Sequence, residues 1–219
     1  MPTTLTPPLP VPLLGTVADL LDRLGGVPPR RVWLHPTPGM ATEDDVISAE
    51  RRANRLCELV DGVLVEKAMG FPESVLAGAI LAALRAFVKP RKLGVVSGAD
   101  GMMRLVPGLI RIPDVAFISI ERLPGGHMPV QPVPDLVPDL AVEVLSESNT
   151  EAEMDRKRRE YFDAGVRLLW VVDPGPRTVA VYTAADQFRV LLQDDTLDGD
   201  PVLPGLTLPL RPLFAELDL

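Results

Sequence analysis

Two carboxylates stand inside apolar, strand-like segments of this chain. Asp114 lies in IRIPDVAFIS and Glu143 lies in DLAVEVLS. Carboxylates are disfavoured in strand interiors, and a buried charge is costly unless it is paired or bound to a cation. Two such acids on adjacent strands, with a backbone carbonyl between them, supply the oxygen ligands that Mg²⁺ prefers. The pattern therefore predicts a divalent-metal site at the edge or mouth of a sheet.

A helix predicted after Glu143 adds a positive charge. In TEAEMDRKRREYF, the residues Met154, Lys157 and Tyr161 follow the i, i+3, i+7 spacing of one helix face. Because Met154 and Tyr161 are expected to face the sheet, Lys157 is held toward the two acids. There it could orient a water molecule or stabilise a developing negative charge. The neighbouring cations are expected to be solvated: Arg156, Arg158 and Arg159.

Each of these residues also has a structural interpretation when it is taken alone. Asp114 follows a proline and could end a strand, and Lys157 could be one partner of an ion pair. Glu143 alone favours neither interpretation. Their occurrence together, in the order strand, strand and helix, favours a functional site. Cys57 has no histidine near it in the sequence and is expected to be a core thiol.

The composition excludes several classes of protein. The 219 residues contain 22 Lys and Arg against 30 Asp and Glu, a formal net charge of −8, and 47% of them are hydrophobic. This hydrophobicity excludes a disordered chain. The negative charge argues against coating nucleic acid by bulk charge, but it leaves room for a local basic groove. The two histidines exclude a multi-histidine zinc site.

The apolar segments are too short to predict a membrane span, which needs about 20 consecutive apolar residues. The longest, Val75 to Leu84, predicts a buried helix, so no membrane association is expected. The N-terminal segment lacks the positively charged region of a secretory signal. A single cysteine fits a reducing compartment. We therefore expect a cytoplasmic protein.

Local signals predict a mixed α/β fold. Asp61-Gly62 between two apolar runs predicts a hairpin of residues 56–60 and 63–68. Further strands are expected at 95–96, 102–106, 110–119, 139–146 and 166–173, and helices at 17–24, 43–54, 72–89 and 151–164. Residues 1–15 are expected to form a flexible Pro-rich arm, and 16–219 a single domain that ends in a β-meander. A central mixed sheet flanked by helices is the expected architecture.

Four segments, in order, resemble the Uma2 family of the PD-(D/E)xK restriction-endonuclease-like superfamily. They are ELVDGVLVE, IPDVAFIS, PDLAVEVLSESNT and DRKRREYFDAGVRLLWVVDP. Together they span more than half of the chain. The resemblance implies a restriction-endonuclease-like core, in which a mixed sheet is built from an α-β-β-β-α-β series.

The resemblance also implies which residues form the site. Asp114 matches the acid of the PD element, Glu143 matches the acid of the (D/E)xK element, and Glu58 matches an earlier acid that often completes the metal site. The lysine expected two positions after Glu143 is replaced by Leu145. The family likeness places this lysine on the following helix, which here is Lys157.

The function implied is that of a Mg²⁺- or Mn²⁺-dependent endonuclease that hydrolyses phosphodiester bonds of nucleic acid, with DNA as the expected substrate. Asp114 and Glu143 would hold the metal, helped by Glu58 and the Val144 carbonyl, and Lys157 would assist the reaction. Because many nucleases of this fold cut two strands with two sites, a homodimer is expected by analogy.

Two other functions stay open at this point. One is a catalytically inactive module that keeps the fold and binds nucleic acid or protein. The other is a small-molecule hydrolase that uses the same acids. Retention of the full set of four side chains favours an enzyme, whereas the net charge of −8 and the lack of an obvious recognition domain favour the module.

Overall fold

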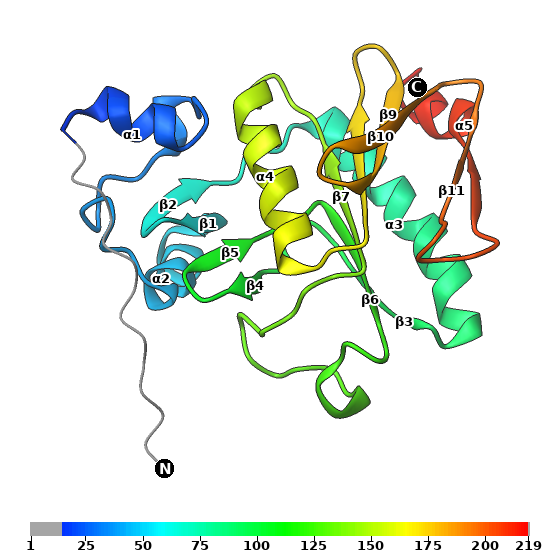
Figure 1. Cartoon of the computed structure of the whole chain (residues 1–219), viewed down its shortest axis with the longest axis horizontal. Helices are drawn as coiled ribbons and strands as arrows, with labels where there is room; N and C mark the ends of the chain where they lie inside the picture. Colours follow the sequence, from blue (N-terminus) through cyan, green and yellow to red (C-terminus); the bar gives the residue numbers. More distant parts are fainter. Residues whose placement is uncertain (1–14, 219) are drawn as a thin grey trace.

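A six-stranded mixed sheet forms the centre of the computed structural model, which describes residues 15–218 (Figure 1). Its strand order is β10-β9-β8-β7-β6-β3. The strands are β3 (Gly94–Ser97), β6 (Val115–Ser119), β7 (Leu140–Val144), β8 (Leu168–Asp173), β9 (Thr178–Ala184) and β10 (Gln187–Leu192). Only β7 and β8 pair in parallel, and α4 (Glu151–Ala164) connects them. This arrangement confirms the predicted mixed α/β class.

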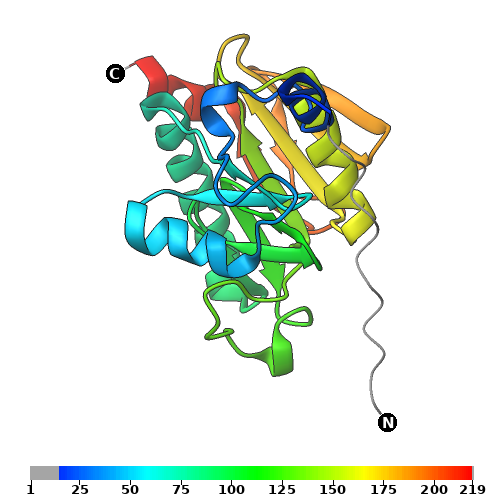
Figure 2. The same ribbon diagram turned by 90° about the vertical axis from the view of Figure 1, so that its left-hand side faces the viewer.

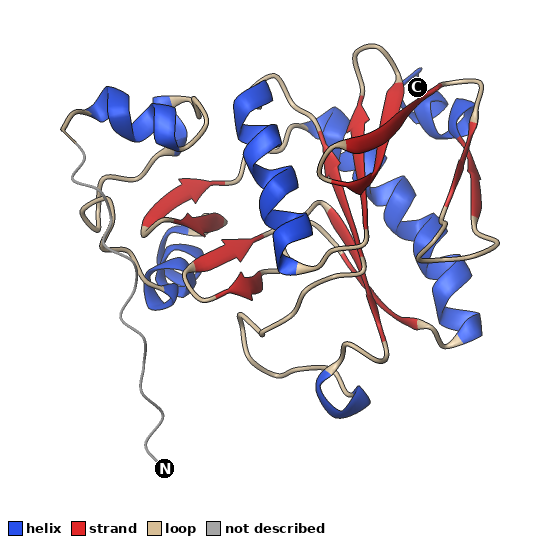
Figure 3. Cartoon of the chain, viewed as in Figure 1, coloured by secondary structure: helices blue, strands red, loops and turns tan. Residues whose placement is uncertain are grey.

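A second, four-stranded antiparallel sheet has the order β2-β1-β5-β4 and is separate from the large one (Figure 3). Its strands are β1 (Cys57–Val60), β2 (Val63–Glu66), β4 (Met103–Val106) and β5 (Leu109–Arg111). The predicted hairpin is confirmed, because Asp61 and Gly62 have φ values of 52° and 70°. A two-residue turn with positive φ at both positions matches the right-handed twist of the strands.

The prediction of one continuous strand over residues 110–119 is wrong. The segment divides into β5 and β6, and these strands belong to different sheets. Pro113 lies at the break, where its missing N–H removes a ladder hydrogen bond. The chain therefore passes from the small sheet to the large one at the residue before Asp114, which brings that acid to the junction of the two sheets.

Two helices cover opposite faces of the large sheet (Figure 1). On one face, α3 (Phe71–Arg91) packs Leu76, Ile80 and Leu84 into a core with Phe117 and Trp170. The short helix α5 (Leu210–Ala215) adds to the same core. On the other face, α4 packs through Tyr161. Because side chains alternate along β7, Glu143 shares the α4 face with Ala141.

Helix α3 is long and apolar enough to cross a membrane, judged by length and composition alone. In the fold its buried stripe lies against the large sheet, as expected for the apolar stretch Val75 to Leu84.

The N-terminal part of the described chain packs beside the small sheet and α4 (Figure 2). Helix α1 (Val17–Arg23) begins with a capping box between Thr16 and Asp19, and α2 (Glu43–Ala53) packs on the small sheet. Apart from Gly15, the predicted arm lies outside the described residues. The remaining elements are η1 (Pro29–Arg31), η2 (Pro124–Gly126), β11 (Thr196–Asp198), β12 (Thr207–Pro209) and η3 (Glu216–Asp218).

Candidate active site

Glu58 on β1 is fully buried, with 0% of its surface exposed. Its carboxylate accepts hydrogen bonds from the Ile112 N–H at 3.2 Å and from Arg111 Nη1 at 2.6 Å. The Lys157 ammonium lies 3.1 Å from its Oε1 atom. Burial alone would raise the pKa of Glu58, but the charges of Lys157 and Arg111 outweigh it and lower the pKa to about 2. Glu58 is therefore an ionised carboxylate that holds two cations.

Glu143 on β7 is also buried and faces α4. Tyr161 donates its hydroxyl to Glu143 Oε1 at 2.6 Å, and Lys157 Nζ lies 3.3 Å from Oε2. Burial raises the pKa of Glu143; Lys157 opposes this rise, while the charges of Asp114 and Glu58 reinforce it. Unlike Glu58, the Glu143 carboxylate is not fully compensated by its neighbours.

Asp114 comes from the junction between the two sheets and lies beside β7. Its N–H donates to the Val142 carbonyl at 2.9 Å, and its Oδ2 atom accepts the Val144 N–H at 2.6 Å. Its Oδ1 atom lies 2.7 Å from the ammonium of Lys67. Asp114 thus stands directly before β6, while Glu143 lies on the neighbouring strand β7, and the Val144 N–H contacts Asp114.

Lys157, on α4, contacts two of the acids, Glu58 and Glu143. Burial alone would lower its pKa, but the Glu143 and Glu58 carboxylates outweigh this effect and raise the pKa, so the amine stays charged. The expected inward position is found for Lys157 and Tyr161, which are buried, whereas Met154 is half-buried. The structure therefore brings Glu58, Glu143 and Lys157 together directly, with Asp114 adjacent through β7.

Two of the arginines on α4 are not solvated as expected. Arg156 forms ion pairs with Asp61 at 3.0 Å and with Glu160 at 2.7 Å. Arg158 pairs with Asp155 at 2.7 Å and stacks its guanidinium over the Tyr182 ring. Asp155 and Glu160 lie on α4 itself, one helical turn from their partners. Asp61 and Tyr182 come from other elements, which helical spacing does not reveal. Arg159 remains largely exposed.

The chemistry of the donor set fits a hard divalent cation. The acids supply carboxylate oxygens, which Mg²⁺ and Mn²⁺ prefer. The raised pKa of Glu143 shows that this buried carboxylate would gain from a further positive charge. Within residues 15–218, no group of three or more His, Cys, Asp or Glu side chains is already arranged around one point as a metal cage. The acids are instead held by ammonium and guanidinium groups.

Comparison with known proteins gives the family of this chain. The family Uma2, described as "Putative restriction endonuclease", matches residues 45–211, more than half of the sequence. The chain belongs to the Uma2 family. This confirms the resemblance carried by the sequence motifs, and the match spans all four predicted site residues and Val144. None of the curated proteins matches the chain.

A solved structure is similar to this Uma2 chain in fold. The crystal structure of "a putative nuclease belonging to DUF820" from Anabaena variabilis superposes with a TM-score of 0.67. The two chains are 20% identical, and the match covers 75% of this chain and 92% of the other. At this level of identity the similarity shows that the two chains share their fold.

Three further residues of this Uma2 protein contact the acids, and sequence reasoning gave them no part in the site: Lys67, Arg111 and Tyr161. Helical spacing predicts that Tyr161 faces inward, but it does not indicate that the Tyr161 hydroxyl donates to Glu143. Arg111 directly precedes the segment IPDVAFIS and also pairs with Glu160. Lys67 follows β2 and carries no local signal of its partner.

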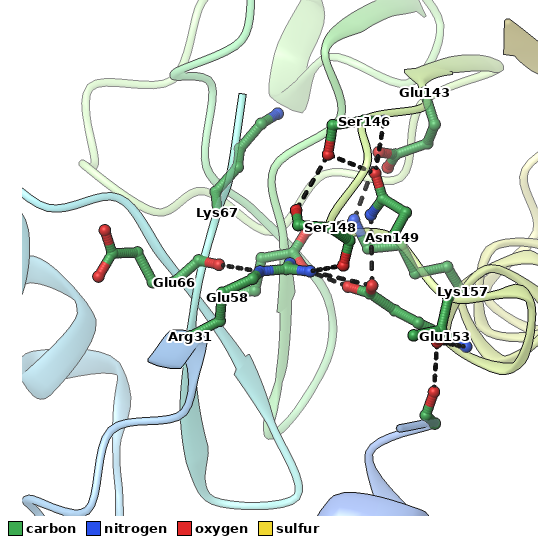
Figure 4. Close-up of polar contacts among 12 residues, drawn as sticks. Arg31, Glu58, Glu66, Lys67, Glu143, Ser146, Ser148, Asn149, Glu153 and Lys157 are labelled. Atoms are coloured by element: carbon green, nitrogen blue, oxygen red, sulfur yellow. Dashed lines mark hydrogen bonds and ion pairs between the residues drawn. The ribbon is translucent and has the colours of Figure 1, made fainter. Parts of the chain in front are cut away.

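A surface cavity of about 840 Å³ lies next to the buried acids. Lys67, Ser146 and Ser148 contribute to its lining. Figure 4 shows Lys67 extending from the end of β2, with Ser146 and Ser148 on the segment that follows β7. The same view shows Arg31 between β2 and α4, where it donates to the Glu66 carbonyl and to Glu153. Through these contacts Arg31 connects α4 to Glu66, one of the residues that line the cavity.

Proposed function

We propose that this protein is a divalent-metal-dependent endonuclease that hydrolyses phosphodiester bonds. The observation that supports it best is the buried contact between Lys157 and Glu143, with Asp114 directly before the neighbouring strand β6. A lysine and two acids at neighbouring central strands are groups that a metal-assisted phosphodiester hydrolysis can use. The family and the fold support this reaction class, and the donor set supports Mg²⁺ or Mn²⁺.

Each side chain has a proposed part in the reaction. Asp114 and Glu143 would hold the metal with the Val144 carbonyl, and Glu58 would complete the acidic set through its contact with Lys157. When bound, such an ion lowers the pKa of a coordinated water and offsets charge on the phosphate. Lys157, which stays protonated, would orient the attacking water or stabilise the developing negative charge. Tyr161 fixes the orientation of the Glu143 carboxylate through its hydrogen bond.

The proposal is tested by incubating the protein with supercoiled DNA, single-stranded DNA and RNA, in Mg²⁺, Mn²⁺ or EDTA. We expect cleavage that depends on the metal and is lost in Asp114→Asn. Cleavage in EDTA, or equal cleavage by Asp114→Asn, would contradict the proposed site.

One observation favours the alternative of an inactive module that binds nucleic acid or protein. All three acids already have cationic partners, namely Lys67, Arg111 and Lys157. A cluster that is neutralised internally can persist for stability alone. Specific nucleic-acid binding without cleavage in any metal would establish this alternative.

We further propose DNA as the substrate and a homodimer as the working form, with residues 16–219 acting as one domain. The edge strand β10 exposes Phe188, Val190 and Leu192, which supports an interface on the C-terminal meander. Light scattering of the purified protein tests the dimer, and a monomeric mass at working concentration would contradict it. The free, buried thiol of Cys57 supports a cytoplasmic location.

A further inference from the structure

Lys67 is the link between the surface cavity and the buried acids. Its ammonium lies 2.7 Å from Asp114 Oδ1 and also donates to the Ile112 carbonyl. Its side chain is 7% exposed. Among the described side chains that contact the three acids, Lys67 alone also lines the cavity of about 840 Å³.

The cavity carries two more cations near its rim. Arg30 and Arg55 both line it and are exposed to solvent. Arg55 shares its charge with Glu66 through an ion pair of 2.7 Å. Four acids also line the cavity: Glu66, Glu73, Asp100 and Glu147. The lining as a whole is therefore not basic, and the places in it that suit an anionic group are those beside its cations.

A second cavity nearby has the opposite character. It is about 970 Å³ in volume and lies between α4 and the strands β8, β9 and β10. Arg158 is the single cation in its lining, against five acids: Glu73, Glu147, Glu151, Asp155 and Asp173. Such a rim repels a phosphate backbone. Among the described residues, three cations line the cavity that contains Lys67 and one lines the other, so the first is the better place for a phosphate.

We propose that Lys67 is a substrate-binding residue that holds one backbone phosphate of a nucleic-acid strand at the floor of this cavity, with Arg30 and Arg55 contacting the strand at the rim. This inference rests on the proposed function, because it names the substrate contact of the same site. Lysine suits the task because its ammonium is a compact point charge with three donors on a flexible stem. The ammonium rests on Asp114 in the free protein and turns toward the phosphate when the strand is bound.

The test measures binding separately from cleavage. Fluorescence anisotropy of labelled single- and double-stranded DNA is recorded in EDTA over a range of salt concentrations. Lys67→Met is expected to weaken binding roughly tenfold and to reduce the slope of log K against log salt by about 1, as loss of one phosphate contact does. Lys89→Met, an exposed lysine on α3 outside the cavity, is the matched control and should bind like the wild type.

A second set of variants keeps the proposal testable if Lys67→Met folds poorly. Arg30→Ala and Arg55→Ala alter exposed side chains and should each weaken binding about two- to fivefold, with thermal unfolding close to that of the wild type. Lys67→Arg keeps the charge and should retain most of the salt slope. Unchanged affinity in a folded Lys67→Met variant would overturn the inference, as would unchanged affinity in both arginine variants or a wild type that binds no nucleic acid.

The outcomes separate this inference from the proposed function. A wild type that cleaves, together with a Lys67→Met variant of unchanged affinity, refutes the phosphate contact and leaves the nuclease intact. Binding that depends on Lys67 without cleavage in any metal supports the contact and refutes the nuclease.

Discussion

The Lys157 ammonium lies 3.3 Å from the Glu143 carboxylate, although the two residues are 14 positions apart and stand on different elements. In the motif that the sequence resembles, the lysine would follow the acid by two positions along the same strand, where this chain has Leu145. Helix α4 packs on the face of the sheet to which Glu143 points. The Lys157 ammonium therefore reaches Glu143 from the helix and not from a neighbouring position on the same strand.

The first prediction concerns the metal. Saturating Mg²⁺ or Mn²⁺ should raise the melting temperature of the wild type, because a ligand that binds only the folded state stabilises it. Glu143→Gln should lose this shift. The variant itself should be at least as stable as the wild type in EDTA, since the raised pKa means that ionised Glu143 is disfavoured on folding. Differential scanning fluorimetry measures both effects.

The matched control for this experiment is Glu147→Gln, which alters an exposed acid three residues after the end of β7. It should keep the full metal-induced shift. An equal shift in Glu143→Gln would mean that the metal binds elsewhere.

The second prediction is a pH dependence set by Glu58. Its pKa falls from 4.5 to about 2 on folding, which corresponds to about 3 kcal/mol of stability. Because the folded-state pKa is lowered, this contribution is fully present above about pH 4.5 and is lost as the pH falls toward 2. Glu58→Gln should therefore be destabilised by about 3 kcal/mol at pH 7 and much less near pH 3.

Urea unfolding of wild type and Glu58→Gln across this pH range provides the measurement. A difference in unfolding free energy that stays constant from pH 7 to pH 3 would show that the Glu58 charge does not provide the stability.

The third prediction concerns the buried pair between Arg31 and Glu153, whose atoms Nη2 and Oε1 are 2.9 Å apart. Arg31→Ala should cost about 3–5 kcal/mol, because it leaves a buried carboxylate without its counter-ion. The double variant Arg31→Met/Glu153→Leu should recover most of the loss. The matched control is Arg55→Ala, which removes a side chain that is 58% exposed and should cost less than about 1 kcal/mol.

Chemical denaturation of the four proteins gives the comparison. If Arg31→Ala were no more destabilising than Arg55→Ala, the Arg31–Glu153 pair would not be what holds α4 against the N-terminal segment.

Much of the fold could be predicted because its signals are local. Asp61-Gly62 determines a hairpin, and Thr150 with Gly165 bounds α4 through short-range capping contacts. The division of residues 110–119 between two sheets could not be predicted, because it depends on which distant strands each half meets. A proline within the segment was the one local sign of it.

The candidate site follows the same division between local and distant information. The inward position of Lys157 follows from helical spacing. Glu143 faces α4 because side chains alternate between the two faces along β7. Lys67 and Arg111 reach their partners across 45 and 53 positions of the chain, at Ile112 and Glu58. Such pairs depend on the packing of the two sheets, and no sequence spacing encodes them.

The most direct test of the central claim is the Mg²⁺-dependent cleavage rate of Lys157→Ala relative to Arg159→Ala, an exposed arginine two residues away. Because Lys157 neutralises two buried acids, its removal also costs stability, so the rates are compared below the melting temperature of each variant. We expect Lys157→Ala and Lys157→Arg to lose cleavage while keeping the metal-induced thermal shift, and Arg159→Ala to cut like the wild type. A Lys157→Ala variant that cuts as fast as the wild type would show that Lys157 has no part in the reaction.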